Sequence, residues 1–513
     1  MKKQLLMGID AGTESVRVGL YDLQGKEVGI GVTEYQTFQP KPGWAEQNPR
    51  EWWSALVTST KKALSQSEAS KEEVIGISLD TTSCSVVLCK NDGTPLRSSL
   101  IWMDVRASEE AKFIAATNNK SLKYNGFSNV SPEWMPCKAL WLKRNDTENY
   151  DKADKVVDFT DWYTYMLTGR WTGNLCNATF KAYYDLDEGG WPIDFYKEIG
   201  LSDLIGKFPD NILKLGERVG GLSRKAANEL ELCEGTPVGQ GGIDSIIGLI
   251  GLGVVKPGRL ALITGSSHLL FGLTEKKFHA KGIFGAYPHG LVPNLNVIEG
   301  SQISTGSILK WFKTQFCKDL EEEAANKDVS VYDLLTLDAE KIPPGSEGLL
   351  VMDYWQGNRT PFIDPNLRGM IYGLSLMHRR EHLFKAIMEG ISYGTDHIIQ
   401  TFKENGFSVT EVYAAGGATK SKLFLQIHAD VSNITINVPE NSEAPLLGSA
   451  ILGGVAAGAF QDIEDGIEQM VRIKDIIKPN KENHEKYKEI AQQYRKVYPQ
   501  FGNWMRETTK VSQ

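Results

Sequence analysis

Cysteine is scarce in this sequence, and its few copies are not arranged as a metal site or a disulfide framework. Six cysteines are scattered over 513 residues, with no Cys-x-x-Cys pair and no histidine nearby to complete a metal site. Zinc sites and disulfide scaffolds need regular spacings of these residues. The eight histidines show no metal-ligand spacing either. We therefore expect reduced, mostly buried thiols and a cytoplasmic location.

Long hydrophobic runs and an excess of basic residues are also missing. The longest stretch of apolar residues and glycine, at 246–255, is about half of the roughly 20 residues that a membrane helix needs. Asp10 ends the first apolar run too early for a signal peptide. The 56 basic and 64 acidic side chains give a formal charge of -8, whereas nucleic-acid binding needs a basic surface. We expect a soluble protein with no membrane and no nucleic-acid partner.

Glycine, by contrast, is abundant. The chain has 50 glycines in 513 residues, whereas an average protein has roughly 7% glycine. Many of them form short runs at the ends of apolar segments, where a backbone without side chains can approach a ligand closely. The chain is also too long for one ordinary hydrophobic core, so we expect more than one domain.

A strand pattern begins twice along the chain. Three strands joined by tight turns are expected at 4–10, 16–23 and 28–35. They are followed by a helix from Asn48-Pro49 to about residue 65. Near residue 258 the pattern restarts with strands at 259–264 and 268–275. Such a repeat predicts two related α/β domains, 1–256 and 257–513, with a ligand cleft between them. The charged segment after residue 475 is predicted to be a peripheral helix.

The first of these strands ends in a turn rich in glycine and hydroxyl groups. Residues 8–17 read GIDAGTESVR, which places a carboxylate, a small-residue turn and a cation in succession. Backbone N–H groups, Thr13 and Ser15 could donate to phosphate oxygens, and Asp10 could hold Mg²⁺ through water. An ordinary hairpin with an aspartate in its turn is the alternative. Similar turns follow later strands, TGSS at 264–267 and GGAT at 416–419, and three such strand ends favour a polyphosphate ligand.

One aspartate lies between a glycine pair and an apolar helix. Asp244 follows Gly241-Gly242-Ile243, where it could be a structural N-cap. It could equally accept the proton of a substrate hydroxyl as that oxygen attacks a phosphorus atom. The spacing alone leaves both interpretations open.

Several other residues have a chemistry suited to a polyol. Trp102, Asp104 and Arg106 offer a ring face, a carboxylate and a guanidinium within five residues, and sugars need polar partners beside an apolar platform. A strand end with a surface ion pair is the alternative. Lys181 and Glu299 are further candidates for this site, but each could also be a solvated surface charge, as most such side chains are. His268 is predicted to be packed rather than catalytic.

Taken together and in this order, these residues resemble the FGGY family of carbohydrate kinases, from residue 7 to about residue 458. The family is part of the superfamily of sugar kinases, heat-shock proteins and actin. The resemblance therefore implies two actin-like, ribonuclease H-like domains around a central cleft. The sugar would lie on the N-terminal domain and the nucleotide mainly on the C-terminal one.

The resemblance also implies roles for individual residues. Asp244 matches the catalytic base, and Asp10 would hold the metal ion. The residues expected to bind the sugar are Trp102, Asp104, Arg106, Lys181, Asp244 and Glu299. Those expected to bind ATP are Gly12, Thr13, Ser15, Arg17, Thr264, Gly265, Ser266, Gly306, Lys310, Gly416, Gly417 and Ser421. The second phosphate turn departs from the family, which usually reads Gly-Thr-Ser where this chain has Thr264-Gly265-Ser266.

Within the family, the segments at 79–84, 102–107, 180–182 and 299–302 look like the sugar-site segments of ribulose-type pentulose kinases. The implied reaction is phosphorylation of a terminal hydroxyl of a pentulose such as ribulose, with ATP and Mg²⁺. Xylulose, erythrulose, a tetritol or glycerol are the alternative acceptors. A catalytically silent ATP-binding regulatory protein on the same fold is the alternative from another class. A homodimer is a further possibility.

Overall fold

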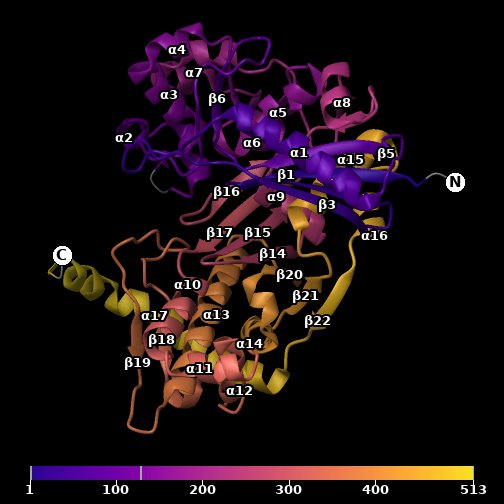
Figure 1. Cartoon of the computed structure of the whole chain (residues 1–513). Helices are drawn as coiled ribbons and strands as arrows, with labels where there is room; N and C mark the ends of the chain where they lie inside the picture. The colour runs from indigo at the N-terminus through magenta and orange to yellow at the C-terminus, as the bar shows by residue number, and fades with distance from the viewer. Residues whose placement is uncertain (1–2, 128–129, 512–513) are drawn as a thin grey trace.

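Two mixed β-sheets with flanking helices make up the protein in the computed structural model, which describes residues 3–127 and 130–511 (Figure 1). The first half of the chain forms one sheet and the second half forms the other. The two α/β domains predicted from the repeated strand pattern are therefore present. Among the described residues, no helix is both long and apolar enough to cross a membrane.

The first sheet has the strand order β11-β12-β5-β1-β2-β3, with β13 also paired to β5. Strand β1 runs antiparallel to β2 and parallel to β5, and all seven of its residues are buried. The three strands predicted near the N-terminus are confirmed. The bounds are β1 (Leu5–Ala11), β2 (Ser15–Asp22), β3 (Glu27–Glu34), β5 (Val74–Thr81), β11 (Arg218–Gly221), β12 (Pro237–Gly239) and β13 (Gly242–Ile243).

Helix α1 (Pro49–Ser67) covers one face of the first sheet. Its predicted start is confirmed, because the Asn48 side chain accepts a hydrogen bond from the backbone N–H of Arg50 and Pro49 occupies the first turn. The helix backbone comes so close to β3 that a Cβ added to Gly31 would lie 2.0 Å from the carbonyl oxygen of Ser59.

Helix α15 (Ala444–Ala457) covers the opposite face of the first sheet, although it comes from the second half of the chain. A Cβ added to Gly8 of β1 would lie 2.1 Å from the carbonyl oxygen of Leu446, and one added to Gly76 of β5 would lie 2.3 Å from that of Gly453. Many glycines therefore serve close packing of a helix on a sheet rather than ligand binding. The predicted domain boundary after residue 256 lies between the segments that form the two sheets. Helix α15 is an exception, because it comes from the second half of the chain but packs on the first sheet.

The second sheet has the strand order β16-β17-β15-β14-β20-β21-β22. Its hairpin β14–β15 repeats the antiparallel pairing of β1 and β2, and β14 runs parallel to β20. The strand bounds are β14 (Arg259–Thr264), β15 (His268–Thr274), β16 (Phe284–Pro288), β17 (Asn296–Gln302), β20 (Glu411–Gly416), β21 (Thr435–Pro439) and β22 (Ile473–Ile477). The helices packed around it include α10 (Gly306–Phe316), α12 (Val331–Ala339), α13 (Arg380–Glu404) and α14 (Lys422–Ser432).

A smaller sheet and several helices form an insertion beside the first sheet (Figure 1). The small sheet has the order β4 (Glu46–Gln47), β7 (Ser99–Leu100), β6 (Val86–Cys89) and β8 (Lys155–Asp158). The helices that bear on the site are α3 (Met135–Asn145), α5 (Phe159–Thr168), α6 (Leu175–Lys181) and α9 (Asp244–Leu252). The remaining elements are α2 (Ser108–Ala116), α4 (Thr147–Lys152), β9 (Gly173–Asn174), α7 (Ile193–Glu198), β10 (Ile212–Leu213), α8 (Arg224–Leu230), α11 (Leu320–Asn326), β18 (Leu350–Met352), β19 (Met370–Tyr372) and α16 (Ile463–Met470).

The last helix, α17 (Lys481–Val511), is not peripheral, and this prediction was wrong. Its Tyr487 and Tyr494 are buried in the second core and donate hydrogen bonds to the carboxylates of Glu389 and Asp353. The charged residues that suggested a surface helix occupy its solvent side. The expectation for the cysteines is confirmed, since all six are free and only Cys233 is not buried.

Candidate active site

The turn between β1 and β2 brings together the residues predicted to bind phosphate. Asp10 and Arg17 lie opposite each other in the strand pair, with Arg17 Nη1 3.4 Å from Asp10 Oδ2 and 3.0 Å from Glu443 Oε2. The backbone N–H of Gly12 donates to the carbonyl of Ser15 at 3.0 Å. The Trp102 indole donates to the Thr13 hydroxyl at 2.9 Å. The turn therefore holds a cation, a buried carboxylate and a hydroxyl at one strand end.

Three aspartates meet at this edge of the first sheet. Asp80 lies opposite Asp10 in the parallel pair β1–β5, and β13, whose Gly242 pairs with Asp80, leads directly into Asp244. Burial, and then the charge of Asp10, raise the pKa of Asp244 to about 7. Burial, and then Asp10, also hold the pKa of Asp80 well above its usual range. An environment of this kind is typical of proton-transfer sites.

Asp244 is the first residue of helix α9, and Ile243 occupies the N-cap position without a side-chain hydrogen bond to the helix. Among the residues that the structure describes, the one hydrogen-bond donor to Asp244 Oδ1 is the adjacent backbone N–H of Ser245, at 2.6 Å. The carboxylate thus does not make the N-cap bond to the second or third helical N–H. The structural N-cap interpretation was wrong, and the other interpretation, a proton acceptor, stays a prediction.

Asp80 lies in the segment 79–84, which the family resemblance placed at the sugar site, but sequence reasoning gave this aspartate no role of its own. It is fully buried at the end of β5, where its Oδ2 accepts a hydrogen bond from the Ser449 hydroxyl of α15 at 2.7 Å. The side chain of Asp10 lies within hydrogen-bonding reach of the same carboxyl. An aspartate within the apolar run of residues 74–81 was the available signal, because a carboxylate is rarely buried without a reason.

Lys181 and Glu299 reach the same region from different domains. Lys181 ends α6 and Glu299 lies on β17. Burial lowers the pKa of Lys181, but the neighbouring Cys84, Glu299, Glu133 and Cys176 together leave the pKa raised. The charge of Lys181 in turn lowers the pKa of Asp244. The predicted base thus has a cation beside it that can orient a polar substrate.

Of the three residues predicted in the Trp102 segment, only Trp102 is exposed, at 38%. Asp104 and Arg106 are buried, and Arg106 Nη2 lies 2.7 Å from Asp104 Oδ2 and 2.8 Å from Glu46 Oε1. The Arg106 guanidinium also lies 3.7 Å from the ring centroid of Trp44. Nε and Nη2 of Arg106 are thus paired within the protein, whereas its Nη1 is buried without a hydrogen-bond partner among the described residues. The pair is not the surface ion pair of the alternative reading, and it supports the loop that carries Trp102.

A pocket of about 610 Å³ opens beside the second sheet, next to the other two small-residue turns. Its apolar lining includes Leu309, Tyr332, Phe384, Met388 and Phe424, and its polar lining includes Thr264, Gly265, Gly306, Gly417 and Ser421. Its size and mixed lining suit a nucleoside. Ser266, Lys310 and Gly416 do not line this pocket, although Gly416 pairs with Thr264.

Thr264 joins two of these loops. Its hydroxyl donates to the carbonyl of Ala415 at 2.6 Å and accepts from the backbone N–H of Ala418 at 2.9 Å. His268, which also lines the pocket, is buried and has its pKa lowered to about 3 by burial. It is therefore a neutral, packed side chain, as predicted.

The residues at the phosphate turn fit a hydrated Mg²⁺ rather than a protein cage. Within residues 3–127 and 130–511, no group of three or more His, Cys, Asp and Glu side chains is arranged to hold a metal ion. Mg²⁺ keeps several waters and often takes only one or two carboxylates. The carboxylate of Asp10, 6% exposed at the strand end, offers one such hard oxygen ligand.

The raised pKa of Asp244 predicts the pH dependence of the reaction. A protonated carboxyl cannot accept a proton, so kcat/KM for the acceptor should rise about tenfold per pH unit up to about pH 7 and then level off. Steady-state rates between about pH 5.5 and about pH 8.5 test this. ATP affinity measured by calorimetry over the same range is the control. A kcat/KM that is flat below pH 7 would contradict the assignment.

A partly buried carboxylate beside a lysine, a glycine-containing turn suited to phosphate and a nucleoside-sized pocket on a two-domain α/β fold are the features of a phosphotransferase. The chain matches the N-terminal domain of the FGGY family of carbohydrate kinases over residues 5–251 and the C-terminal domain over residues 260–457. It belongs to this family and is a carbohydrate kinase that uses ATP.

Full-length relatives and solved structures agree with this assignment. A ribulokinase from Geobacillus thermodenitrificans is 32% identical over 549 residues, covering 99% of this chain and 97% of the relative. A FGGY carbohydrate kinase domain-containing protein from Xenopus laevis is 33% identical over 520 residues, covering 94% of both. The fold is similar to that of xylulose kinase from Rhodospirillum rubrum, with a TM-score of 0.86, 24% identity and coverage of 98% of this chain and 100% of that one.

Proposed function

We propose that this carbohydrate kinase phosphorylates a terminal hydroxyl of a pentulose, with ribulose as the preferred acceptor. The observation that carries the proposal is the position of Asp244, a partly buried carboxyl at the edge of the sheet, whose pKa near 7 suits a general base and whose neighbour Lys181 suits a polyol substrate. The several ribulokinases among the full-length relatives support ribulose as the acceptor.

In the proposed mechanism, Asp244 accepts the proton of the attacking hydroxyl. That oxygen bonds to the γ-phosphorus as the bond to the leaving ADP oxygen breaks. Lys181, Glu299 and Trp102 orient the sugar, while Thr13 and Arg17 stabilise charge on the transferred group. Asp10 would hold Mg²⁺ through water, and the ion would offset negative charge on the β- and γ-phosphates.

The nucleotide would bind with its adenosine in the 610 Å³ pocket and its phosphates directed to the turns at Gly265 and Gly12. The apolar side chains of the pocket suit the base, and the glycine-containing turns suit phosphate oxygens, since backbone N–H groups can be approached closely there. The roles of Ser15, Ser266 and Lys310 rest on the family resemblance alone.

A screen of ADP release tests the acceptor. The panel comprises both enantiomers of ribulose and xylulose, together with erythrulose, the tetritols and glycerol. We expect one ribulose enantiomer to have the highest kcat/KM, at least about tenfold above glycerol. A higher value for any other acceptor would replace ribulose, and ATP binding without turnover of any acceptor would favour the silent regulatory protein.

The six free cysteines suit a cytoplasmic location, where thiols stay reduced. We propose that location on this ground. A homodimer stays a prediction that sedimentation of the purified protein would test.

A further inference from the structure

The turn that follows β5 contains a residue in an uncommon conformation. Cys84 has a φ of 59°, in the left-handed region that few residues other than glycine adopt. Its side chain is 2% exposed. The turn begins at Thr82, whose backbone N–H donates to the carbonyl of Ala11 next to the phosphate turn. A buried turn in this conformation, so close to the site, must be held by its surroundings.

Two buried ionisable side chains hold Cys84 from both sides. Its backbone N–H donates to Asp158 Oδ2 at 3.0 Å, and its carbonyl accepts from Lys138 Nζ at 2.7 Å. Lys138 comes from α3 and is fully buried, and Asp158 ends β8 and is 4% exposed. We call these three residues the Cys84 clamp.

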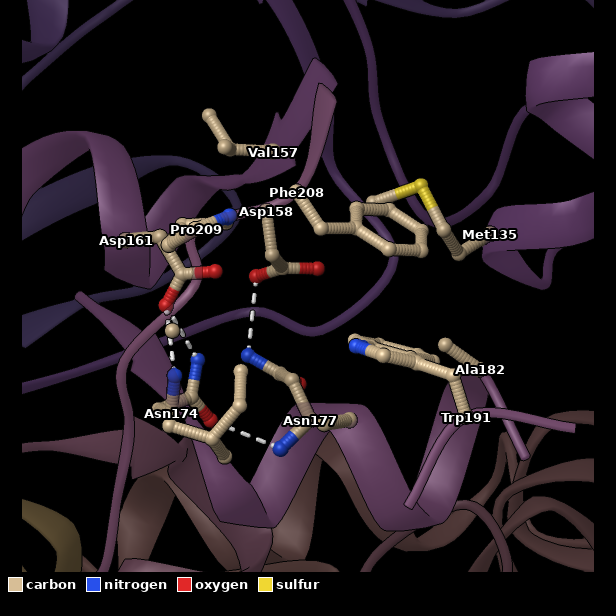
Figure 2. Close-up of a pocket in the computed structure, with 13 residues that line it drawn as sticks. Met135, Val157, Asp158, Asp161, Asn174, Asn177, Ala182, Trp191, Phe208 and Pro209 are labelled. Atoms are coloured by element: carbon tan, nitrogen blue, oxygen red, sulfur yellow. Dashed lines mark hydrogen bonds between the residues drawn. The ribbon is translucent and has the colours of Figure 1, made fainter. Parts of the chain in front are cut away.

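Lys138 and Asp158, the two arms of the clamp, each form a hydrogen bond with a further segment of the proposed sugar site. Lys138 Nζ also donates to the carbonyl of Ile101 at 2.5 Å, directly before Trp102. Asp158 Oδ1 accepts a hydrogen bond from Asn177 Nδ2 at 2.9 Å. Figure 2 shows this bond, with Asn177 projecting from α6, the helix that ends at Lys181.

The chemistry of the clamp is unusual for a core position. Burial lowers the pKa of Lys138 and raises that of Asp158, since both charged forms lose hydration. Apolar side chains of similar volume often stabilise a core as well or better. Ionisable groups at these positions are therefore better explained by what they hold in place than by the stability they add. Asp158 also accepts from the N–H of Thr160 at the start of α5, so part of its role is structural.

We propose that Lys138 and Asp158 are positioning residues that hold the Cys84 turn, the Trp102 loop and Lys181 in one arrangement, and thereby set acceptor affinity and stereoselectivity. The proposal rests on the sugar site described under the proposed function. It assigns neither residue a contact with the sugar or the nucleotide. Their removal should therefore affect the acceptor and not ATP.

The test compares clamp variants with matched buried variants in the second domain. The clamp variants are Lys138→Met and Asp158→Asn. The controls are Lys385→Met, whose Nζ donates to the carbonyl of Ile342, and Glu389→Gln, whose carboxylate accepts from Gly345, Ser346 and Tyr487. Both controls remove buried polar contacts from α13, away from the proposed sugar site.

We expect the clamp variants to raise the acceptor KM about tenfold or more, with the ATP KM within about twofold of wild type. Discrimination between pentulose stereoisomers should fall in parallel. The control variants should lower Tm by a similar amount but keep acceptor KM and discrimination within about twofold. Clamp variants that lower Tm and leave the acceptor KM and discrimination unchanged would overturn the proposal.

Asn177→Ala covers the case in which a clamp variant does not fold, because it leaves Lys138 and Asp158 in place and removes the link between Asp158 and α6, together with a hydrogen bond to the Thr160 hydroxyl. It too should raise the acceptor KM and spare ATP, and an unchanged acceptor KM would overturn the proposal for that arm. If the wild-type protein prefers an acceptor other than a pentulose, the proposed function fails, and the same comparison is made with the preferred acceptor. The two failures are thus distinguishable.

Discussion

Replacing Asp244 by asparagine should lower kcat by at least about a hundredfold, because the amide cannot accept a proton and base catalysis is typically worth that much or more. The substitution keeps the shape of the side chain and the hydrogen bond from the backbone N–H of Ser245. ATP affinity should stay close to that of wild type. Acceptor-dependent ADP release measures the rate, and calorimetry measures ATP binding.

Asp353→Asn is the matched control for the loss of a buried, protonatable carboxyl. Burial raises the pKa of Asp353 to about 6, yet this residue contacts Tyr494 and Gln302 in the second domain rather than the phosphate turn. Its kcat should stay within about tenfold of wild type. An Asp244→Asn variant that is as active as this control would remove Asp244 from the mechanism.

Replacing Gly416 by alanine should weaken ATP binding at least about tenfold and lower Tm, while the folded fraction keeps its acceptor affinity. A Cβ at this position would lie 1.9 Å from the carbonyl oxygen of Thr264, and the φ of 87° is strained for any residue with a side chain. Relief of this clash must move β20 away from Thr264, which lines the nucleoside-sized pocket. Calorimetry with ATP and thermal unfolding measure the two effects.

The adjacent Gly417→Ala is the control for this variant. A Cβ at Gly417 would meet no atom within 4 Å, and its φ is not positive. We expect little change in Tm and a smaller loss of ATP affinity than in Gly416→Ala, because the added methyl group displaces no protein atom even though Gly417 lines the pocket. Equal losses in both variants would show that the loop responds to any side chain, and the argument from the contact with Thr264 would fail.

The strand ends were predictable from the sequence because their features are local. Residues 8–17 contain the whole first turn, and the cap at Asn48 and the turn at Gly416 are each formed by neighbours in the chain. A pattern of glycine, hydroxyl and carboxylate after an apolar run therefore indicated both the fold and a phosphate site. The sequence also indicated Asp244 as a candidate functional residue. It did not show that Asp244 is the first residue of α9 rather than its N-cap.

What could not be predicted depends on partners far apart in the chain. Asp80 accepts a hydrogen bond from the side chain of Ser449, and Asp104 accepts one from the backbone N–H of the distant Ala45. Because burial decides whether a charged group meets a ligand or another side chain, the segment around Trp102 could not be divided into exposed and buried members beforehand. The Cys84 clamp could not be predicted for the same reason, because Lys138 comes from a separate helix, α3.

The return of α15 to the first sheet means that the two halves of the chain are not independent folding fragments. A polypeptide that stops at residue 256 would present the glycine-lined surface of β1 and β5 with no helix to cover it. The rest of the chain would carry an apolar helix without its sheet, with eleven of its fourteen residues buried in the intact protein. Co-expressed halves should therefore be mutually dependent, each insoluble alone and recovered together by fragment complementation.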